Sequence, residues 1–305
     1  MSPPITDRTP SLRTVYAKLV AVSAIWGGTF VAGRYLGREV APLISASARF
    51  LLASVVLLAY LLVTRTPIRI PEKRLLLRLA MLGFFGVLAY NICFFYGLRH
   101  TTASRASLIV SLNPAMIALA SFCFLHERLR RMQIAGILLC IAGAGLVIVS
   151  RSGGSLSGTL YGDGVVLGCV VSWVVYSVFS RSVSERLGPL LTVSYSIWFG
   201  TLMLCGASVL VVDEPFLPAL YGMSAGQWAG IVYLGIVGSA VAYIWYYDAI
   251  RHIGATRSGA FIALNPVTAV FFGILLFGEE ITLLTCLGGM LAIFGICLCN
   301  GVGKK

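Results

Sequence analysis

Charged side chains are scarce in this 305-residue chain: they make up 11% of the residues, against 58% for apolar residues. Soluble domains carry about 25% charged residues, because charged side chains cover the surface that faces water. A chain with so few of them has too little polar surface for water, and lipid is its natural solvent. The composition therefore predicts an integral membrane protein.

The chain also lacks the signatures of common enzymes and metal sites. It contains no HExxH motif, no phosphate-binding glycine loop, no nucleophile elbow and no deep pair of carboxylates. Eight cysteines occur, but none forms a CxxC pair or clusters with histidine, so we interpret them as small packing residues. We expect no enzyme activity, no cofactor and no metal site.

Ten apolar runs have the length of about 20 residues that a membrane-spanning α-helix needs. They lie near residues 15–36, 41–63, 75–98, 102–125, 131–150, 160–181, 188–212, 224–249, 255–277 and 282–300. The connections are short, and the first run is too long for a cleaved signal peptide. We predict an all-α integral membrane fold with ten transmembrane helices, preceded by a cytoplasmic tail over residues 1–14.

The net charge of +12 comes from basic residues that lie scattered between the apolar runs and form no single basic face. We therefore expect no nucleic-acid partner and interpret these residues as topology signals. If the N-terminus is cytoplasmic, 17 of the 23 basic residues fall on the inner side, five on the outer side, and Arg49 within the second run. The positive-inside rule then places both termini in the cytoplasm.

The sequence contains an internal repeat, in which an offset of 152 residues maps Arg99–Arg105 onto Arg251–Arg257. Further matches are Leu112-Asn113-Pro114 with Leu264-Asn265-Pro266, Glu127 with Glu279, Gly136 with Gly288, Gly143 with Gly295 and, at an offset of 147, Arg34 with Arg181 and Pro42 with Pro189. Chance gives a few matches, but a collinear series over several helices predicts two repeats of five helices each. We place them at residues 15–150 and 158–301.

An odd number of helices in each repeat means that the second copy enters the membrane in the opposite orientation. The loops agree with this inversion. The loop after the fourth run holds Arg128, Arg130 and Arg131, whereas its counterpart holds Glu279 and Glu280. Inverted repeats are the architecture of alternating-access transporters, which bind substrate near the midplane where the repeats meet.

The repeated Asn-Pro pair is the strongest signal for a binding site. Pro114 and Pro266 each lie near the middle of an apolar run, where a proline frees the carbonyl four residues earlier. Matching interruptions in two halves indicate a binding region, where Asn113 and Asn265 would line a cavity. The alternative is a structural kink, with each asparagine bonded to a neighbouring helix.

Aromatic residues also lie deep in the apolar runs, where a hydroxyl or an indole N–H needs a partner. They would line a largely apolar cavity with a few polar groups, or belong to the interfacial aromatic belts. Together with the two asparagines, they give a predicted substrate-binding set of Trp26, Tyr90, Asn91, Asn113, Trp173, Tyr176, Tyr243 and Asn265.

Ionisable residues within the runs are few. Arg49 meets a substrate carboxylate or extends to the outer membrane interface, and we favour the second interpretation. Asp163 and Asp248 lie near helix ends, where we expect solvated caps or ion pairs. No carboxylate lies at mid-membrane, which disfavours a proton antiporter built on a buried glutamate.

Four segments together are typical of one family: Ile25-Trp26-Gly27; Arg49-Phe50; Ala103 through Pro114 followed by His126-Glu127-Arg128; and Ala255 through Pro266 followed by Gly278-Glu279-Glu280. Over residues 15–300 the chain resembles the ten-helix branch of the drug/metabolite transporter superfamily, whose members carry two EamA domains. Because Arg49 belongs to the general pattern of that family, the resemblance favours a structural role for it.

The resemblance implies a multi-pass exporter of small metabolites in the bacterial inner membrane, with amino acids as a frequent substrate class. It also implies alternating access around a cavity lined by helices 1, 3, 4, 6, 8 and 9. The aromatic-rich runs favour aromatic and other apolar amino acids. We expect a small-molecule substrate and a monomer or homodimer.

Three alternatives remain. One is a multidrug exporter of the same fold. A sugar-phosphate or nucleotide-sugar exchanger needs several cavity lysines or arginines, and only Arg49 lies well within a run. A membrane scaffold or sensor is disfavoured because we find no extramembrane domain to carry a signal.

Overall fold

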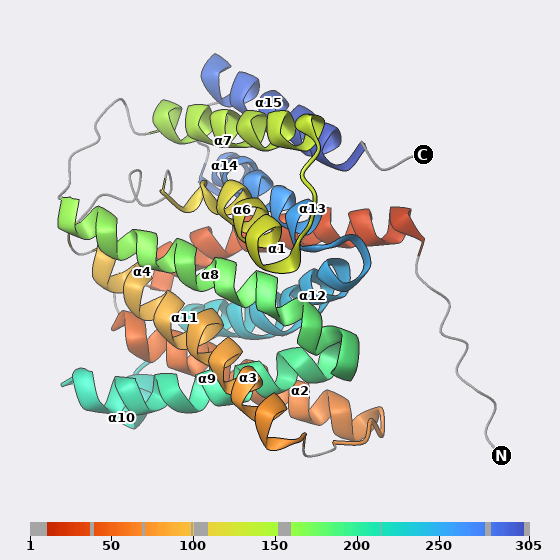
Figure 1. Cartoon of the computed structure of the whole chain (residues 1–305). Coiled ribbons are helices and arrows are strands. Elements are labelled where there is room, and N and C mark those ends of the chain that lie inside the picture. Colours follow the sequence, from red (N-terminus) through yellow and green to blue (C-terminus); the bar gives the residue numbers. More distant parts are fainter. Residues whose placement is uncertain are drawn as a thin grey trace.

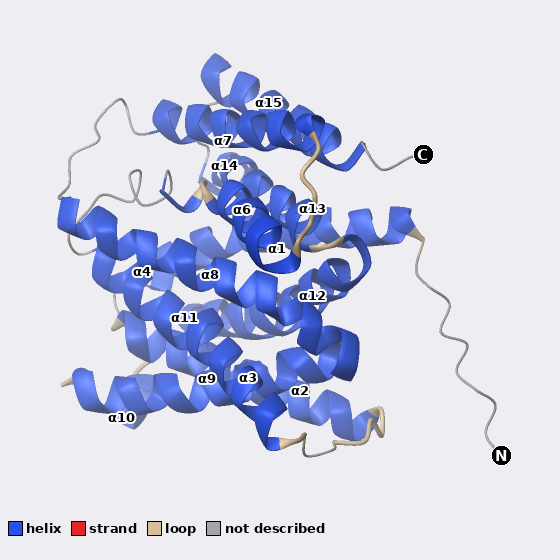
Figure 2. Cartoon of the chain, viewed as in Figure 1, coloured by secondary structure: helices blue, strands red, loops and turns tan. Residues whose placement is uncertain are grey.

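The computed structural model describes residues 11–36, 40–68, 71–98, 100, 109–151, 160–213, 215–277 and 282–301. Within these ranges the regular elements are helices, and no strand occurs (Figure 2). This confirms the predicted all-α fold. We use "first half" for residues 11–151 and "second half" for residues 160–301.

The first half contains five helical segments that correspond to the first five predicted runs. Its elements are α1 (Leu12–Leu36), α2 (Pro42–Val63), α3 (Lys73–Gly83), the π-helix η1 (Phe84–Ala89), α4 (Tyr90–Leu98), α6 (Asn113–Leu125) and α7 (Arg131–Arg151). The elements α3, η1 and α4 follow each other without a break. Proline at the first position of α2 fits the helix start, where an amide has no intrahelical acceptor.

The second half repeats this order. Its elements are α8 (Leu160–Leu187), α9 (Pro189–Val211), the short α10 (Phe216–Tyr221), α11 (Ala225–Val232), the π-helix η2 (Tyr233–Val241), α12 (Ala242–Ile253), α13 (Ala255–Ala260), the 3-10 helix η3 (Phe261–Leu264), α14 (Asn265–Phe277) and α15 (Leu283–Gly301). Five helical stretches among the described residues are long and apolar enough to cross a membrane. The count of ten crossings stays a prediction.

Two predicted helix ends are wrong. Helix α8 continues to Leu187 instead of ending near residue 181, and α12 continues to Ile253 instead of ending near residue 249. Hydropathy falls where arginines begin, but arginine is a good helix former, so the helix continues. The helices end instead at Gly188 and Gly254, whose positive φ angles of 80° and 85° favour glycine.

Helices α7 and α15 lie side by side along one edge of the bundle (Figure 1). A Cβ atom added to Gly136 would lie 2.6 Å from the carbonyl oxygen of Gly295, and one added to Gly143 would lie 2.5 Å from that of Gly288. These glycines therefore allow close helix packing, as predicted. Because the repeat pairs 136 with 288 and 143 with 295, the contacts cross between pairs, as a two-fold axis requires.

The same helices contain a contact between repeat mates. The Cys140 thiol lies 3.6 Å from the carbonyl oxygen of Ala292, which is 152 residues further along the chain. A residue meets its own mate only near a two-fold axis. The crossed contacts also show that α7 and α15 are antiparallel, as the predicted inversion of the second half requires.

Helix irregularities recur at matching positions in the two halves. The offset of 152 residues places η1 within η2. The two Asn-Pro pairs also follow irregular backbone: a turn at Ser111 and Leu112 precedes α6, and the 3-10 helix η3 precedes α14. The prolines thus lie in the first turn of an α-helix and not at its middle, because that turn tolerates a missing amide.

Candidate functional site

Aromatic rings from both halves meet in the interior of the bundle. We define the aromatic cluster as Trp26 of α1, Phe50 of α2, Tyr90 of α4, Trp173 and Tyr176 of α8, and Tyr243, Tyr246 and Tyr247 of α12. Trp173 is central: its ring centroid lies 5.3 Å from that of Trp26, 5.7 Å from that of Tyr90 and 5.8 Å from that of Tyr243. Five of the eight predicted site residues therefore belong to one cluster.

The rings of this cluster are buried, except that of Tyr90, which is partly buried. Trp26 is 9% exposed, Trp173 and Tyr243 are each 6% exposed, and Tyr176 is fully buried. Their edge-to-face and tilted pairs stabilise the interior beyond simple burial, by about 0.5–1.5 kcal/mol for each pair. The alternative interpretation of these residues as an interfacial belt is wrong, because belt residues face lipid headgroups.

The two π-helices position the cluster. Trp26 donates its indole N–H to the carbonyl of Gly238 in η2 over 3.1 Å, and the Asn91 amide donates to the carbonyl of Val87 in η1 over 2.6 Å. Tyr90 directly follows η1, and Tyr243 follows η2 by two residues. Turns of π-helix are rare and frequently mark functional sites, and here each one receives a donor from a side chain at the cluster.

Trp26 and Trp173 are themselves repeat mates. The offset of 147 residues that maps Arg34 onto Arg181 also maps Trp26 onto Trp173, and the two rings meet at an interplanar angle of 83°. Contact between mates places the pseudo-two-fold axis through the aromatic cluster, as the contact of Cys140 with Ala292 places it through α7 and α15. The same offset, applied to the tryptophans, indicates from sequence that Trp26 and Trp173 are mates, but not that their rings meet.

Arg49 of α2 faces the interior. Its Nη2 donates to Oδ1 of Asn91 over 3.0 Å, and its Cζ lies 4.7 Å from the ring centroid of Phe50. Asn91 is 2% exposed, so this hydrogen bond lies inside the bundle. The favoured interpretation that Arg49 extends to the outer interface is therefore wrong, because a buried acceptor and an aromatic face hold its guanidinium inward. Through Arg49, Asn91 adjoins the aromatic cluster.

Asn113 and Asn265 are placed differently from the other predicted residues. Within the described residues, no ring contact or hydrogen bond joins either of them to the aromatic cluster. Their side-chain oxygens are buried without a hydrogen-bond partner in the same part of the chain. Ile117 of α6 and Phe261 of η3, each four residues from one of these asparagines, belong to the same hydrophobic core as the aromatic cluster.

A polar network joins the two halves at the end of the bundle that the sequence predicts to be cytoplasmic. Glu127, just after α6, accepts from Arg181 Nη1 over 2.6 Å and from the Thr256 hydroxyl over 2.9 Å. Gly254, at the turn between α12 and α13, lies next to the Glu127 carboxylate. In the sequence Glu127 lies in a basic loop, and nothing there indicates these partners, which are 54 and 129 residues away.

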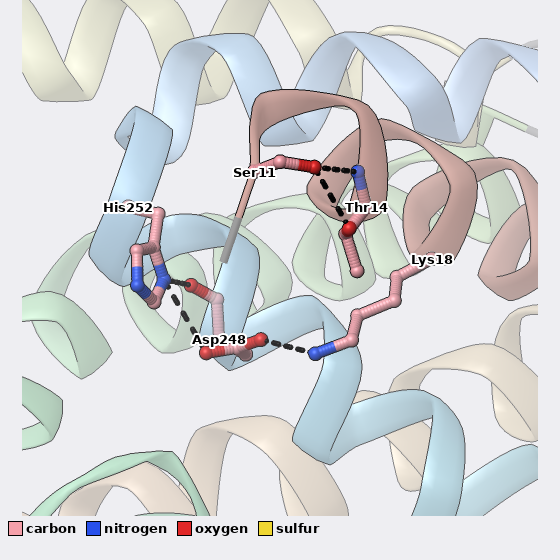
Figure 3. A network of polar contacts seen from close by, with 5 residues as sticks. All are labelled: Ser11, Thr14, Lys18, Asp248 and His252. Carbon is pink, nitrogen blue, oxygen red and sulfur yellow. Dashed lines mark hydrogen bonds and ion pairs between the residues drawn. The ribbon is translucent and has the colours of Figure 1, made fainter. Parts of the chain in front are cut away.

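A second ion pair joins the halves at the same end. Lys18 Nζ of α1 lies 2.7 Å from Asp248 Oδ2 of α12, and His252 Nδ1 lies 3.3 Å from Asp248 Oδ1 (Figure 3). Ser11 accepts from the Thr14 amide one turn before Lys18 and so caps the start of α1. The predicted ion pairing of Asp248 is confirmed.

Comparison with known proteins identifies one family. The model of the EamA-like transporter family matches the chain twice, at residues 14–149 and 160–301. An uncharacterized transporter of Bacillus subtilis (strain 168), YyaM, is 29% identical to the chain over 94% of each sequence. An uncharacterized inner membrane transporter of Escherichia coli (strain K12), YedA, is 27% identical over 94% of this chain and 90% of that protein.

Two further similarities concern substrate and fold. A protein of Streptantibioticus cattleyicolor described as a probable terminal-alkyne amino-acid exporter is 30% identical over 76% of each sequence. A crystal structure with 20% sequence identity superposes with a TM-score of 0.80, covering 97% of this chain and all of the other. At that identity the structural similarity supports the fold alone.

Proposed function

Because the chain belongs to the EamA-like transporter family, within the drug/metabolite transporter superfamily, we propose that it exports amino acids with aromatic or other apolar side chains. Membership in the family makes it a multi-pass membrane transporter. We place it in the bacterial inner membrane with ten crossings and both termini in the cytoplasm. The similar E. coli transporter is described as an inner membrane protein, which supports this location.

The aromatic cluster on the pseudo-two-fold axis is the observation that carries the proposal. In a transporter with inverted repeats, the substrate binds where the repeats meet, and here that position is formed by tryptophan and tyrosine rings. Such rings offer a large apolar contact area together with polar tips, which suits an apolar side chain on a polar body. The similarity to an amino-acid exporter supports the same substrate class.

In the proposed mechanism the two halves rearrange around the cluster. Trp26 and Trp173 are in direct ring contact, so the substrate enters only when these two rings move apart. The ion pairs Glu127–Arg181 and Lys18–Asp248 close the predicted cytoplasmic end in this conformation and break when that end opens. The substrate-binding set is the eight predicted residues, with Asn113 and Asn265 joining it as the helices rearrange.

Counterflow in proteoliposomes tests the proposal. Purified full-length protein is reconstituted into liposomes that are loaded with unlabelled amino acid. Uptake of labelled phenylalanine, tryptophan, leucine and glutamate into these proteoliposomes is then followed. We expect exchange of the first three and little exchange of glutamate. Trp173→Ala should abolish exchange, whereas Trp228→Ala, which changes a 40% exposed tryptophan, should leave it intact. Binding of lipophilic cations without exchange of any amino acid would instead identify a multidrug exporter.

A further inference from the structure

We infer that Arg49 holds the carboxylate of the transported substrate, which makes the substrate a small molecule with a carboxylate and an apolar body, such as an apolar amino acid or a carboxylic acid. This inference rests on the proposed transport function, and it names the chemical class that the same site accepts. The observation behind it is the position of the Arg49 guanidinium. Arg49 lies against the aromatic cluster, and within the described part of the chain no carboxylate pairs with it.

An unpaired guanidinium in a protein interior is costly, because burial removes the water that stabilises its charge. The described residues form ion pairs at Lys18, Arg181 and His252, but none at Arg49. The partners of Arg49 are the neutral amide of Asn91 and the face of Phe50. A cation–π contact offsets part of the cost but carries no negative charge. The carboxylate of a ligand would supply this negative charge.

The Arg49 guanidinium also has hydrogen-bond donors that no described residue uses. Nη2 bonds to Asn91, while Nε is buried and has no hydrogen-bond partner among the described residues. Arginine presents Nε and an adjacent Nη as a fork that matches the two oxygens of a carboxylate. Arg49 as a whole is part-buried, but Nε itself is buried in this conformation, so a carboxylate reaches the fork only when the surrounding helices move apart.

Asn91 holds this fork in place. Its Nδ2 donates to the carbonyl of Val87 over 2.6 Å, which leaves its Oδ1 turned to accept from Arg49 over 3.0 Å. The orientation of Arg49 is therefore fixed through Asn91 by the π-helix η1. A binding group that is oriented before the ligand arrives loses less entropy on binding.

The surroundings of Arg49 define the rest of the ligand. Phe50, next in the chain, has its ring centroid 6.3 Å from that of Tyr243, which in turn contacts Trp173 at 5.8 Å. A carboxylate at Arg49 therefore has its apolar body directed to the aromatic cluster. Amino acids and other aromatic or aliphatic acids have this shape. Lipophilic cations do not, because Arg49 would repel them.

Binding to the purified full-length protein in detergent tests the inference. Tryptophan fluorescence and the thermal unfolding midpoint are recorded with phenylpropionate, L-phenylalanine, L-phenylalanine methyl ester and phenethylamine. We expect the two carboxylates to quench fluorescence and to raise the midpoint, and the two ligands without a carboxylate to bind at least about tenfold more weakly. Arg49→Gln should weaken carboxylate binding by about 30-fold or more, as expected for removing one partner of a buried charge pair.

Two control variants accompany Arg49→Gln. Arg49→Lys keeps the charge but loses the fork, so it should bind carboxylates with intermediate affinity. Arg78→Gln removes an exposed arginine on α3 and should bind as the wild type does. Without ligand, the unfolding midpoint of Arg49→Gln should equal or exceed that of the wild type, because an uncompensated buried charge is gone. A lower midpoint together with unchanged carboxylate binding would identify a purely structural arginine.

Three results would overturn the inference: equal binding of the acid and its ester, unchanged carboxylate binding by Arg49→Gln, or no binding of either carboxylate to the wild type. These results differ from a failure of the proposed function. Phenylpropionate binding without amino-acid counterflow rejects amino acids as the substrate and leaves the anion site standing. Amino-acid counterflow that Arg49→Gln leaves unchanged keeps the proposed function and rejects the anion site.

Discussion

Glu127 Oε1 lies 2.6 Å from Arg181 Nη1, so a residue just after the end of α6 in the first half is ion-paired with α8 in the second. The same carboxylate accepts from Thr256 of α13. One side chain therefore connects three helical segments at the predicted cytoplasmic end. Because the Arg181 guanidinium also contacts Glu185 over 3.1 Å, its orientation toward Glu127 is fixed within α8.

Glu127→Gln removes the negative charge with little change of shape. The pair is part-buried, so its loss should cost more than that of an exposed ion pair and less than that of a fully buried one, about 1–2 kcal/mol. The thermal unfolding midpoint in detergent should fall accordingly. Thr256→Val removes the other partner of the same carboxylate and should cost less. A loss as large as that of Glu127→Gln would show that Thr256, and not Arg181, is the partner that matters.

Lys18 and Asp248 should be energetically coupled. Lys18→Gln, Asp248→Asn and the double variant form a cycle, and we expect a coupling of about 1 kcal/mol in thermal unfolding. Asp248→Asn should be the more damaging single change, because Asp248 also contacts His252. Strictly additive single effects would mean that the 2.7 Å contact contributes no stability.

Trp26→Phe separates the hydrogen bond of this tryptophan from its ring packing. The phenyl ring still contacts Trp173, but the carbonyl of Gly238 loses its indole donor, which should cost about 1 kcal/mol. Trp26→Ala also loses the ring and should cost about 3–5 kcal/mol. Thermal unfolding and amino-acid exchange measure both effects, with Trp228→Phe as the exposed control. A Phe variant as stable as the wild type would mean that the Gly238 carbonyl does not depend on the indole.

Much of the fold could be predicted because membrane helices have a strong local signal. The apolar runs predicted the helices, and the two Asn-Pro pairs predicted positions at which the helix is interrupted. Helix ends were less accurate: Arg181 and Arg251 lower the hydropathy, yet both lie on helices that continue to a glycine with positive φ. Hydropathy predicts the apolar part of a helix, whereas these two helices end where a glycine adopts a positive φ angle.

The candidate site could be predicted only in part, because contacts between helices depend on how each helix is rotated. Depth within the runs identified Trp26, Trp173 and Tyr243, which do meet. The direction of Arg49 is set by the rotation of α2 against α4, and no pattern within α2 reveals it. The partners of Glu127 were missed for the same reason, since they lie on distant segments.

Gly136→Ala places a methyl group where α7 and α15 leave no room. The added Cβ would lie 2.6 Å from the carbonyl oxygen of Gly295 and 2.7 Å from the amide nitrogen of Cys299. Backbone atoms cannot move aside as the end of a side chain can, so the helices must separate, at a cost of about 1–3 kcal/mol. Because Gly295 faces Gly136 across the same contact, and a Cβ added to it would lie 2.6 Å from the carbonyl oxygen of Gly136, Gly295→Ala should cost a similar amount.

Gly206→Ala is the matched control for this prediction, because nothing lies within 4 Å of a Cβ added there in α9. Alanine is favoured over glycine in a helix by about 1 kcal/mol, so this variant should unfold at the same or a higher temperature. Thermal unfolding of the three variants in one detergent compares them directly. If Gly136→Ala lowered the midpoint while Gly295→Ala did not, the close contact of α7 with α15 at these two glycines would be wrong.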